Sequence, residues 1–168
     1  MSGRIFLLGD DIDTDQLAPG QYMKGGLDML AAHCLESARP DFAGSVKPGD
    51  VIVAGKNFGM GSSREQAAEA LKHLGLAGVV AKSFAGIFYR NALNLGLPVL
   101  VADDISRVDD GDAASLDPVA GELRLAAKNQ TVRLEPLPDN LKPMLADGGL
   151  VPHLKKRFAA ERAKEAGA

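Results

Sequence analysis

Residues 50–103 read DVIVAGKNFGMGSSREQAAEALKHLGLAGVVAKSFAGIFYRNALNLGLPVLVAD, and this segment decides the fold. Three runs rich in valine and leucine predict strands, at 50–55, 77–83 and 97–103. Between them, apolar residues recur at helical spacing in two stretches, 62–74 and 84–95. Each stretch is closed by a glycine, Gly75 or Gly96, as helix C-termini prefer. This alternation of strands and helices predicts a parallel sheet with right-handed crossovers.

The flanking regions add elements on both sides of this core. Before it, RIFLL predicts another strand at 4–8. After it, residues 116–138 alternate in short pieces that predict antiparallel strands, and two helices are expected at about 139–147 and 150–163. We therefore expect one α/β domain over residues 1–168, with a mainly parallel core sheet, additional antiparallel strands and a tail after about Arg162 that frays.

Composition is that of an ordinary globular chain. The 168 residues are 46% hydrophobic and 24% charged, with a formal net charge of −3 and no apolar run long enough to cross a bilayer. The first strand ends in acidic residues and lacks the long apolar region of a signal peptide, so a cytoplasmic location is the default. The balance of charge gives no indication of a nucleic-acid or membrane partner, which leaves a protein or a small molecule.

Cys34 is the only cysteine. A single cysteine excludes a disulfide within the chain, and it excludes any cluster or zinc site that would need several thiolates from this chain. His33 and Cys34 lie in LDMLAAHCLESA, an amphipathic stretch, and we expect a packed helix with a buried thiol there and no chemistry.

The stretch NFGMGSSREQA, 57–67, is the strongest candidate for a binding site. Ser62 is expected to start the helix, and both Ser62 and Ser63 have the spacing of a capping box. A helix cap needs one hydroxyl, whereas this loop offers two, with the guanidinium of Arg64 beside them. Gly59 and Gly61 can take positive φ and gather backbone N–H groups into a concave donor site. Together these groups predict a receptor for a carboxylate or phosphate.

Two further clusters follow other strands. GDDIDTDQLAPG, 9–20, places four aspartates after the first strand, but it lacks the glycine and glutamate of a calcium loop, so we predict no metal site. A solvated turn and an acidic group that orients a ligand both remain open for this loop. In KSFAGIFYRNALNLG, Ser83 is a plausible helix N-cap, and Asn91 and Asn94, a turn apart, could brace the serine loop by hydrogen bonds.

Three stretches taken together, GDDIDTDQLAPGQYM, GDVIVAGKNFGMGSSREQAAEALKHLGL and VVAKSFAGIFYRNALNLGLPVL, resemble the small subunits of 3-isopropylmalate dehydratase in the aconitase superfamily. The resemblance covers residues 3–104 densely. It implies a swivelling β/β/α domain of the aconitase C-terminal type, and a hydro-lyase of leucine biosynthesis that isomerises 2-isopropylmalate and 3-isopropylmalate by loss and return of water. It also implies a separate large subunit that carries a [4Fe-4S] cluster.

The resemblance further implies roles for individual residues. Ser62 matches the serine base, Ser63 and Arg64 match groups that bind a substrate carboxylate, and Asp15 matches an acidic residue of the site. Supporting positions are Gly59, Gly61, Asn57, Thr14 and Asn91. A serine hydroxyl is a poor base unless its anion is stabilised, and a helix N-terminus, nearby N–H groups and Arg64 would all favour that anion.

Substrate choice stays open because of QYMKGG, 21–26. An apolar residue after the tyrosine suits an isopropyl group and an arginine suits the distal carboxylate of homoaconitate, whereas Lys24 at this position matches neither. Related activities, 2,3-dimethylmalate dehydratase and homoaconitase, are therefore alternatives. A non-catalytic anion-binding module, which would use Arg64 without Ser62, is a third.

Overall fold

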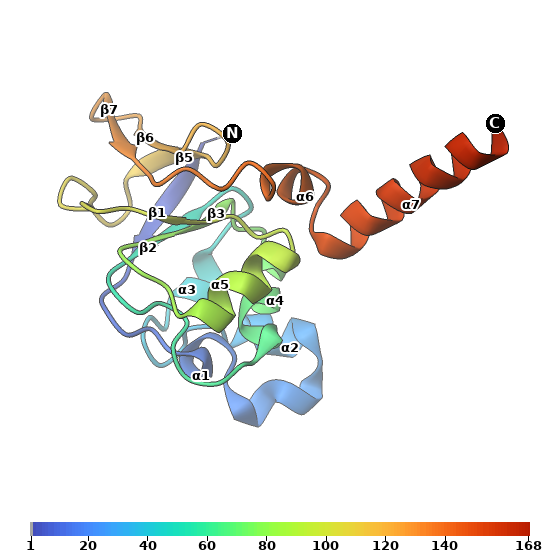
Figure 1. The fold of residues 1–168 in the computed structure, drawn as a ribbon. Helices are drawn as coiled ribbons and strands as arrows, with labels where there is room; N and C mark the ends of the chain where they lie inside the picture. Colours follow the sequence, from blue (N-terminus) through green and yellow to red (C-terminus); the bar gives the residue numbers. More distant parts are fainter. Residues whose placement is uncertain (1) are drawn as a thin grey trace.

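The computed structural model describes residues 2–168 (Figure 1). A parallel half of the sheet is built from β1 (Gly3–Leu7), β2 (Val51–Ala54), β3 (Gly78–Ala81) and β4 (Val99–Val101). The antiparallel half is built from β5 (Ala113–Asp117), β6 (Glu122–Leu125) and β7 (Gln130–Arg133). Seven strands thus run in the order β4-β3-β2-β1-β5-β6-β7. The expected α/β class, with a mainly parallel core and antiparallel additions, is confirmed.

The sheet is curled. Leu116 of β5 lies over Gly78 of β3, although two strands separate β5 from β3 in the sheet. At the outer edges, the amide of Glu135, just after β7, donates a hydrogen bond of 2.8 Å to the carbonyl of Val101 on β4. The antiparallel strands therefore fold back over the parallel half, whose central strands β2 and β3 are fully buried.

The two main helices lie on one face of the parallel strands. Helix α4 (Glu65–His73) connects β2 to β3, α5 (Gly86–Asn94) connects β3 to β4, and the two helices contact each other. Because successive strands are added in one direction with crossovers of one hand, both helices reach the same face (Figure 1). Gly75 and Gly96 follow these helices with φ of 80° and 81°, as the sequence predicts.

Short elements fill the segment between β1 and β2. They are α1 (Thr14–Leu17), the 3₁₀ helix η1 (Gly20–Gly25), α2 (Leu27–Ala32) and α3 (Phe42–Ser45). The amphipathic helix expected to include His33 and Cys34 is shorter than predicted, because α2 ends at Ala32 and Leu35 takes a φ of 61°. Cys34 is nevertheless buried.

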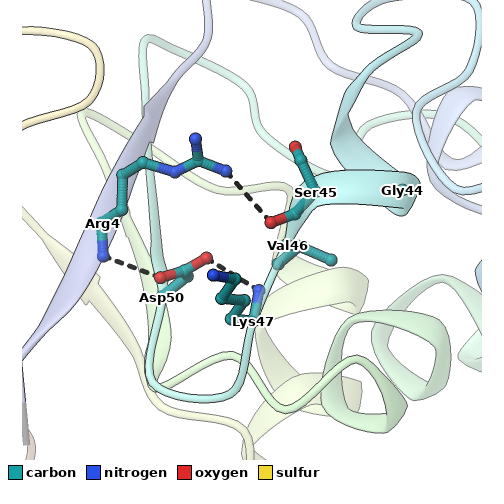
Figure 2. Close-up of a pocket in the computed structure, with 6 residues that line it drawn as sticks. All are labelled: Arg4, Gly44, Ser45, Val46, Lys47 and Asp50. Carbon is teal, nitrogen blue, oxygen red and sulfur yellow. Dashed lines mark hydrogen bonds between the residues drawn. The ribbon is translucent and has the colours of Figure 1, made fainter.

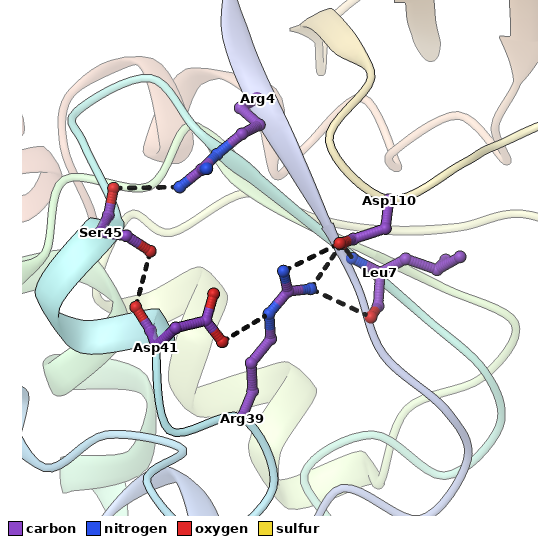
Figure 3. Close-up of polar contacts among 6 residues, drawn as sticks. All are labelled: Arg4, Leu7, Arg39, Asp41, Ser45 and Asp110. Carbon is purple, nitrogen blue, oxygen red and sulfur yellow. Dashed lines mark hydrogen bonds and ion pairs between the residues drawn. The ribbon is translucent and has the colours of Figure 1, made fainter.

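A polar cluster ties this segment to the loop before β5 (Figure 3). The Arg39 guanidinium donates to Asp110 at 2.9 Å and to Asp41 at 3.3 Å, and Asp110 also accepts the N–H of Leu7 at 2.9 Å. The hydrogen bond from Arg39 lowers the pKa of Asp110 below its ordinary value. The Asp110 side chain therefore joins its own loop to Leu7 and to Arg39, which are far apart in sequence.

The chain ends in α6 (Lys142–Ala146) and α7 (Leu150–Ala166). Helix α7 extends away from the rest of the protein, has no buried residue and continues three residues past the expected end at 163 (Figure 1). Within residues 2–168, no helix combines the length and apolar character needed to cross a membrane.

Candidate functional site

The serine loop, residues 57–64, leaves the C-terminal end of β2 and lies against the loop that leaves β1. The amide of Gly59 donates to Ile12 O at 2.7 Å, and the amide of Thr14 donates to Met60 O at 2.8 Å. Asp13 and Met60 also form an isolated parallel bridge. Two stretches that the sequence analysis singled out separately are thus joined at one edge of the sheet, where ligand sites of parallel sheets gather.

Ser62 faces a buried threonine across this contact. Thr14 Oγ1 lies 3.1 Å from Ser62 Oγ and accepts the backbone N–H of Ser62 at 3.1 Å. Thr14 is only 2% exposed, whereas Ser62 and Ser63 are both exposed. Thr14 therefore contacts the Ser62 hydroxyl on its buried side, and Ser62 is exposed to solvent on the other side.

The Arg64 side chain is held by the first helix and the residue that follows it. Its Nη1 donates to the Asp15 carboxylate and to the carbonyl of Ala18, at 3.3 Å for the latter. The Arg64 side chain is 30% exposed and that of Asp15 is 72% exposed. Asp15 and Ala18 thus accept from one guanidinium nitrogen, Nη1. The partly exposed guanidinium has further N–H donors that can bind an anion.

The two loop glycines have the positive φ that the sequence predicts, 82° at Gly59 and 107° at Gly61. Three of the amides expected to form a concave donor site have acceptors within the protein. The amides of Gly59, Met60 and Ser62 donate to Ile12 O, Asn57 O and Thr14 Oγ1 respectively. The bonds from Gly59 and Ser62 attach the loop to the segment after β1, and the bond from Met60 closes a turn within the loop, so these three donors are not available to a ligand.

The predicted capping role of the serines is also wrong. Helix α4 begins at Glu65 with Arg64 as its N-cap residue, and no side chain caps it. Ser62 therefore lies three residues ahead of the helix, in a bend, and does not start it. The Ser63 carbonyl accepts a hydrogen bond of 3.4 Å from the Asn91 side chain, which is the bracing contact expected from α5.

Asn57 begins the serine loop in a left-handed conformation, with φ of 59°. Its side chain donates to Asp11 at 3.0 Å, and its amide donates to Ser83 Oγ at 2.8 Å. Ser83 is therefore not the N-cap of α5, because that position is taken by Ala85 and the Ser83 hydroxyl supports the serine loop instead.

One signal in the aspartate loop was missed. Asp13 is the N-cap of α1, and its carboxylate accepts the Gln16 amide at 2.8 Å while the Gln16 side chain accepts the Asp13 amide at 2.9 Å. The D-x-x-Q spacing, read as a capping box, could have located α1 and with it the orientation of Thr14 and Asp15.

Lys24 lies exposed on η1. The first residue of η1, Gly20, is close to the site, since a Cβ added there would lie 3.8 Å from Arg64 Nη2. A hollow of about 270 Å³ next to Asp15 is lined by residues of this same region, namely Pro19, Gly20, Gln21, Glu36 and Ser37. The segment that carries Lys24 therefore adjoins the guanidinium of Arg64.

The neighbouring His33 and Cys34 make structural contacts. The His33 ring stacks on Tyr22 with centroids 3.6 Å apart and Nδ1 lies 2.6 Å from Glu36. Burial raises the pKa of Cys34 to about 12, so the thiol is inert at neutral pH. Among residues 2–168, no three histidine, cysteine, aspartate or glutamate side chains come together as a metal site, so these residues do not fit a [4Fe-4S] cluster.

A larger hollow of about 430 Å³ lies near the start of β1 and β2, at the opposite end of the parallel strands (Figure 2). Its buried Asp50 accepts the amides of Arg4 at 2.7 Å and Lys47 at 2.8 Å. This acid is satisfied by backbone donors and joins the two strands. We therefore take the serine loop, and not this hollow, as the candidate site.

Comparisons with known proteins show which family the chain resembles. Residues 36–104 match the family model described as the aconitase C-terminal domain. The chain is 50% identical over 155 residues to the methanogen homoaconitase small subunit of Methanothermobacter thermautotrophicus, covering 92% of this chain and 90% of that protein. It is equally identical, at 50% over 158 residues, to 3-isopropylmalate dehydratase small subunit 2 of Archaeoglobus fulgidus, covering 93% and 95%.

Among solved structures, the crystal structure of a 3-isopropylmalate dehydratase from Methanocaldococcus jannaschii superposes with a TM-score of 0.91. The two chains are 45% identical, and the match covers 97% of this chain and 98% of that one. Relatives of two different named activities are thus similar over nearly the whole chain.

Proposed function

The chain belongs to the 3-isopropylmalate dehydratase small-subunit family of the aconitase superfamily, and from that membership we propose that it is the small subunit of a hydro-lyase. The observation that carries the proposal is that one loop presents both the exposed Ser62 and, two residues on, the partly exposed guanidinium of Arg64. A base and an anion-binding fork on one loop suit removal of a proton next to a carboxylate.

We assign the roles within this chain from the family resemblance, and the exposure of the serine loop supports the assignment. Ser62 takes the proton from the carbon next to a substrate carboxylate, and Ser63 and Arg64 bind that carboxylate. Asp15 orients Arg64 through the ion pair, and the partly exposed guanidinium keeps further donors for the carboxylate. Loss of the proton and of the neighbouring hydroxyl as water forms an alkene, and return of water at the other carbon moves the hydroxyl.

The remaining half of the site belongs to a partner. We assign the [4Fe-4S] cluster to a large subunit, where it would act as a Lewis acid on the departing hydroxyl. This assignment rests on the family, and it is supported by the exposure of Ser62 and Ser63, which need a second surface to exclude water from the reaction.

For the substrate we propose 2-isopropylmalate and 3-isopropylmalate, the pair interconverted in leucine biosynthesis. Homoaconitate and 2,3-dimethylmalate are the alternatives, because the resemblance places a lysine, Lys24, at the position that distinguishes substrates, and a lysine can reach a second carboxylate. Overall identity does not choose among them, since the two relatives quoted above are equally similar.

The experiment is a hydration assay on the reconstituted pair. This chain is combined with the cluster-loaded large subunit from the same source, and loss of the alkene is followed for isopropylmaleate, dimethylmaleate and homoaconitate separately. We expect preference for isopropylmaleate and little effect of Lys24→Met. Preference for homoaconitate that is lost in Lys24→Met would move the substrate and keep the mechanism. Inactivity with all three acids, combined with carboxylate binding by the isolated chain in calorimetry, would favour a non-catalytic module.

A further inference from the structure

Thr14 is in direct hydrogen-bonding contact with Ser62, the proposed base. Its hydroxyl oxygen is 3.1 Å from the Ser62 amide nitrogen and 3.1 Å from Ser62 Oγ, and the residue is 2% exposed. Thr14 and Ser62 are 48 positions apart in sequence, so this contact exists only because the two loops meet. Among the described residues assigned to the site, no other side chain has a hydrogen bond to the Ser62 hydroxyl.

The direction of the hydrogen bond can be worked out from the donors available. The Ser62 N–H points its only hydrogen at Thr14 Oγ1, so Thr14 already accepts one bond. If the Ser62 hydroxyl donated as well, the single hydrogen of the buried Thr14 hydroxyl would be left without an acceptor, which costs about 1–3 kcal/mol. If Thr14 donates to Ser62 Oγ instead, the Ser62 N–H and the buried Thr14 hydroxyl both have acceptors, and the Ser62 hydroxyl hydrogen is free to point toward solvent.

We propose that Thr14 is a positioning residue that donates its hydroxyl hydrogen to Ser62 Oγ and thereby stabilises the alkoxide form of Ser62. The inference rests on the proposed function for its catalytic meaning. As Ser62 loses its proton, the bond from Thr14 changes from one between neutral groups to one with a charged acceptor, which is about twice as strong. The structure thus provides a stabilising side-chain donor from a segment distant in sequence.

The surroundings hold Thr14 rigidly in this orientation. Its amide donates to Met60 O at 2.8 Å, and the Asp13 capping box fixes the helix that it begins. Gly61 permits the close approach, because a Cβ at that position would lie 3.0 Å from Thr14 Oγ1. The donor is therefore in place before substrate binds, as electrostatic stabilisation requires.

The first test uses the isolated full-length chain and needs no substrate. Ser62→Cys places a titratable thiol at the same position, and its pKa is measured from the pH dependence of alkylation by iodoacetamide. Cys34 does not interfere, because it is fully buried and its own pKa is raised to about 12. The expected result is a rise of about one pKa unit when Thr14→Val is added, since the thiolate loses its donor.

Controls separate the hydroxyl from the shape of the side chain. Thr14→Ser retains the donor and is expected to leave the thiol pKa unchanged, whereas Thr14→Ala, also without a donor, repeats the test should the valine variant not fold. The charged side chains around position 62 come from both packed segments, Asp13 and Asp15 on one and Arg64 and Glu65 on the other, and they are the same in every variant. An unchanged thiol pKa in the folded valine or alanine variant would overturn the proposal.

The second test measures turnover of the reconstituted pair. Thr14→Val is expected to lower kcat about 10-fold to 100-fold with little change in KM, and Thr14→Ser is expected to restore most of kcat. The loss should be absent in a Ser62→Ala background, because Thr14 acts only through Ser62. A wild-type pair inactive with every acid would defeat the proposed function, and the thiol titration would still decide the role of Thr14.

Discussion

Gly59 is the residue at which the fold and the site depend most closely on each other, and Gly59→Ala tests that dependence. The backbone there has φ of 82°, and an added Cβ would lie 2.7 Å from Phe88 Cδ1 and closer still to two other Phe88 atoms. Phe88 is 2% exposed on α5 and packs against Phe58 with ring centroids 5.3 Å apart, so it has no free space to move into.

Two costs add for this substitution. An alanine forced into the left-handed region costs about 1–2 kcal/mol. Overpacking against a buried ring costs about 1–3 kcal/mol more. For a chain of this length, the total of about 2–5 kcal/mol corresponds to a fall of about 4–20 °C in melting temperature.

The measurement is thermal unfolding of the isolated chain followed by circular dichroism. Gly86→Ala is the matched control, because Gly86 begins α5 and nothing lies within 4 Å of a Cβ added there. The control should be neutral or melt slightly higher, since alanine favours a helix. A Gly59→Ala variant that melts within 2 °C of wild type, by our rough allowance for measurement error, would refute the packing and backbone argument.

Three further predictions concern other side chains. Hydrogen bonding from Arg39 lowers the pKa of Asp110 in the folded protein. The ionised Asp110 therefore stabilises the fold above its unfolded pKa of about 4, and this stabilisation is lost as pH falls through the lowered folded pKa. The difference in melting temperature between wild type and Asp110→Asn should therefore shrink below about pH 4, and a difference that stays constant down to about pH 2 would contradict this. Arg64→Lys retains the charge but loses the planar fork, so KM for the preferred acid should rise about tenfold or more in the reconstituted pair, while Arg162→Lys on α7 should leave KM unchanged. Cys34 should resist thiol reagents at pH 8 until the chain is unfolded, because burial raises its pKa to about 12. Rapid labelling of the native chain would show that the reagent reaches the Cys34 thiol and would contradict this prediction.

The elements of the parallel core could be predicted from local sequence. Val51–Ala54 and Gly78–Ala81 are runs of small and β-branched residues with turn residues before them, and they are buried in the structure as expected. The glycines that end α4 and α5 were also predictable, because a left-handed residue is needed there and glycine adopts it without strain.

The curl of the sheet could not be predicted in the same way. It depends on contacts between distant parts of the chain, such as Leu116 over Gly78 and the Glu135 amide on Val101. Residue patterns within one strand do not specify which face another strand will cover.

The serine loop shows the same limit at the level of single bonds. The spacing from Ser62 to Glu65 fits a helix cap. In the structure, however, the Ser62 amide donates to Thr14, which is distant in sequence, and α4 begins only at Glu65. The residue types pointed to an anion-binding loop with Ser62, Ser63 and Arg64, but the partners of their donors were set by tertiary contact with the Asp13–Thr14 segment.

The measurement that tests the central claim most directly is turnover of the reconstituted pair with Ser62→Ala. If Ser62 is the base, kcat for the preferred acid should fall by about 10²–10⁴-fold or more, while melting temperature and assembly with the large subunit stay as in wild type. Ser63→Ala, one residue on, should chiefly raise KM. A Ser62→Ala pair that keeps most of its wild-type activity would contradict the account.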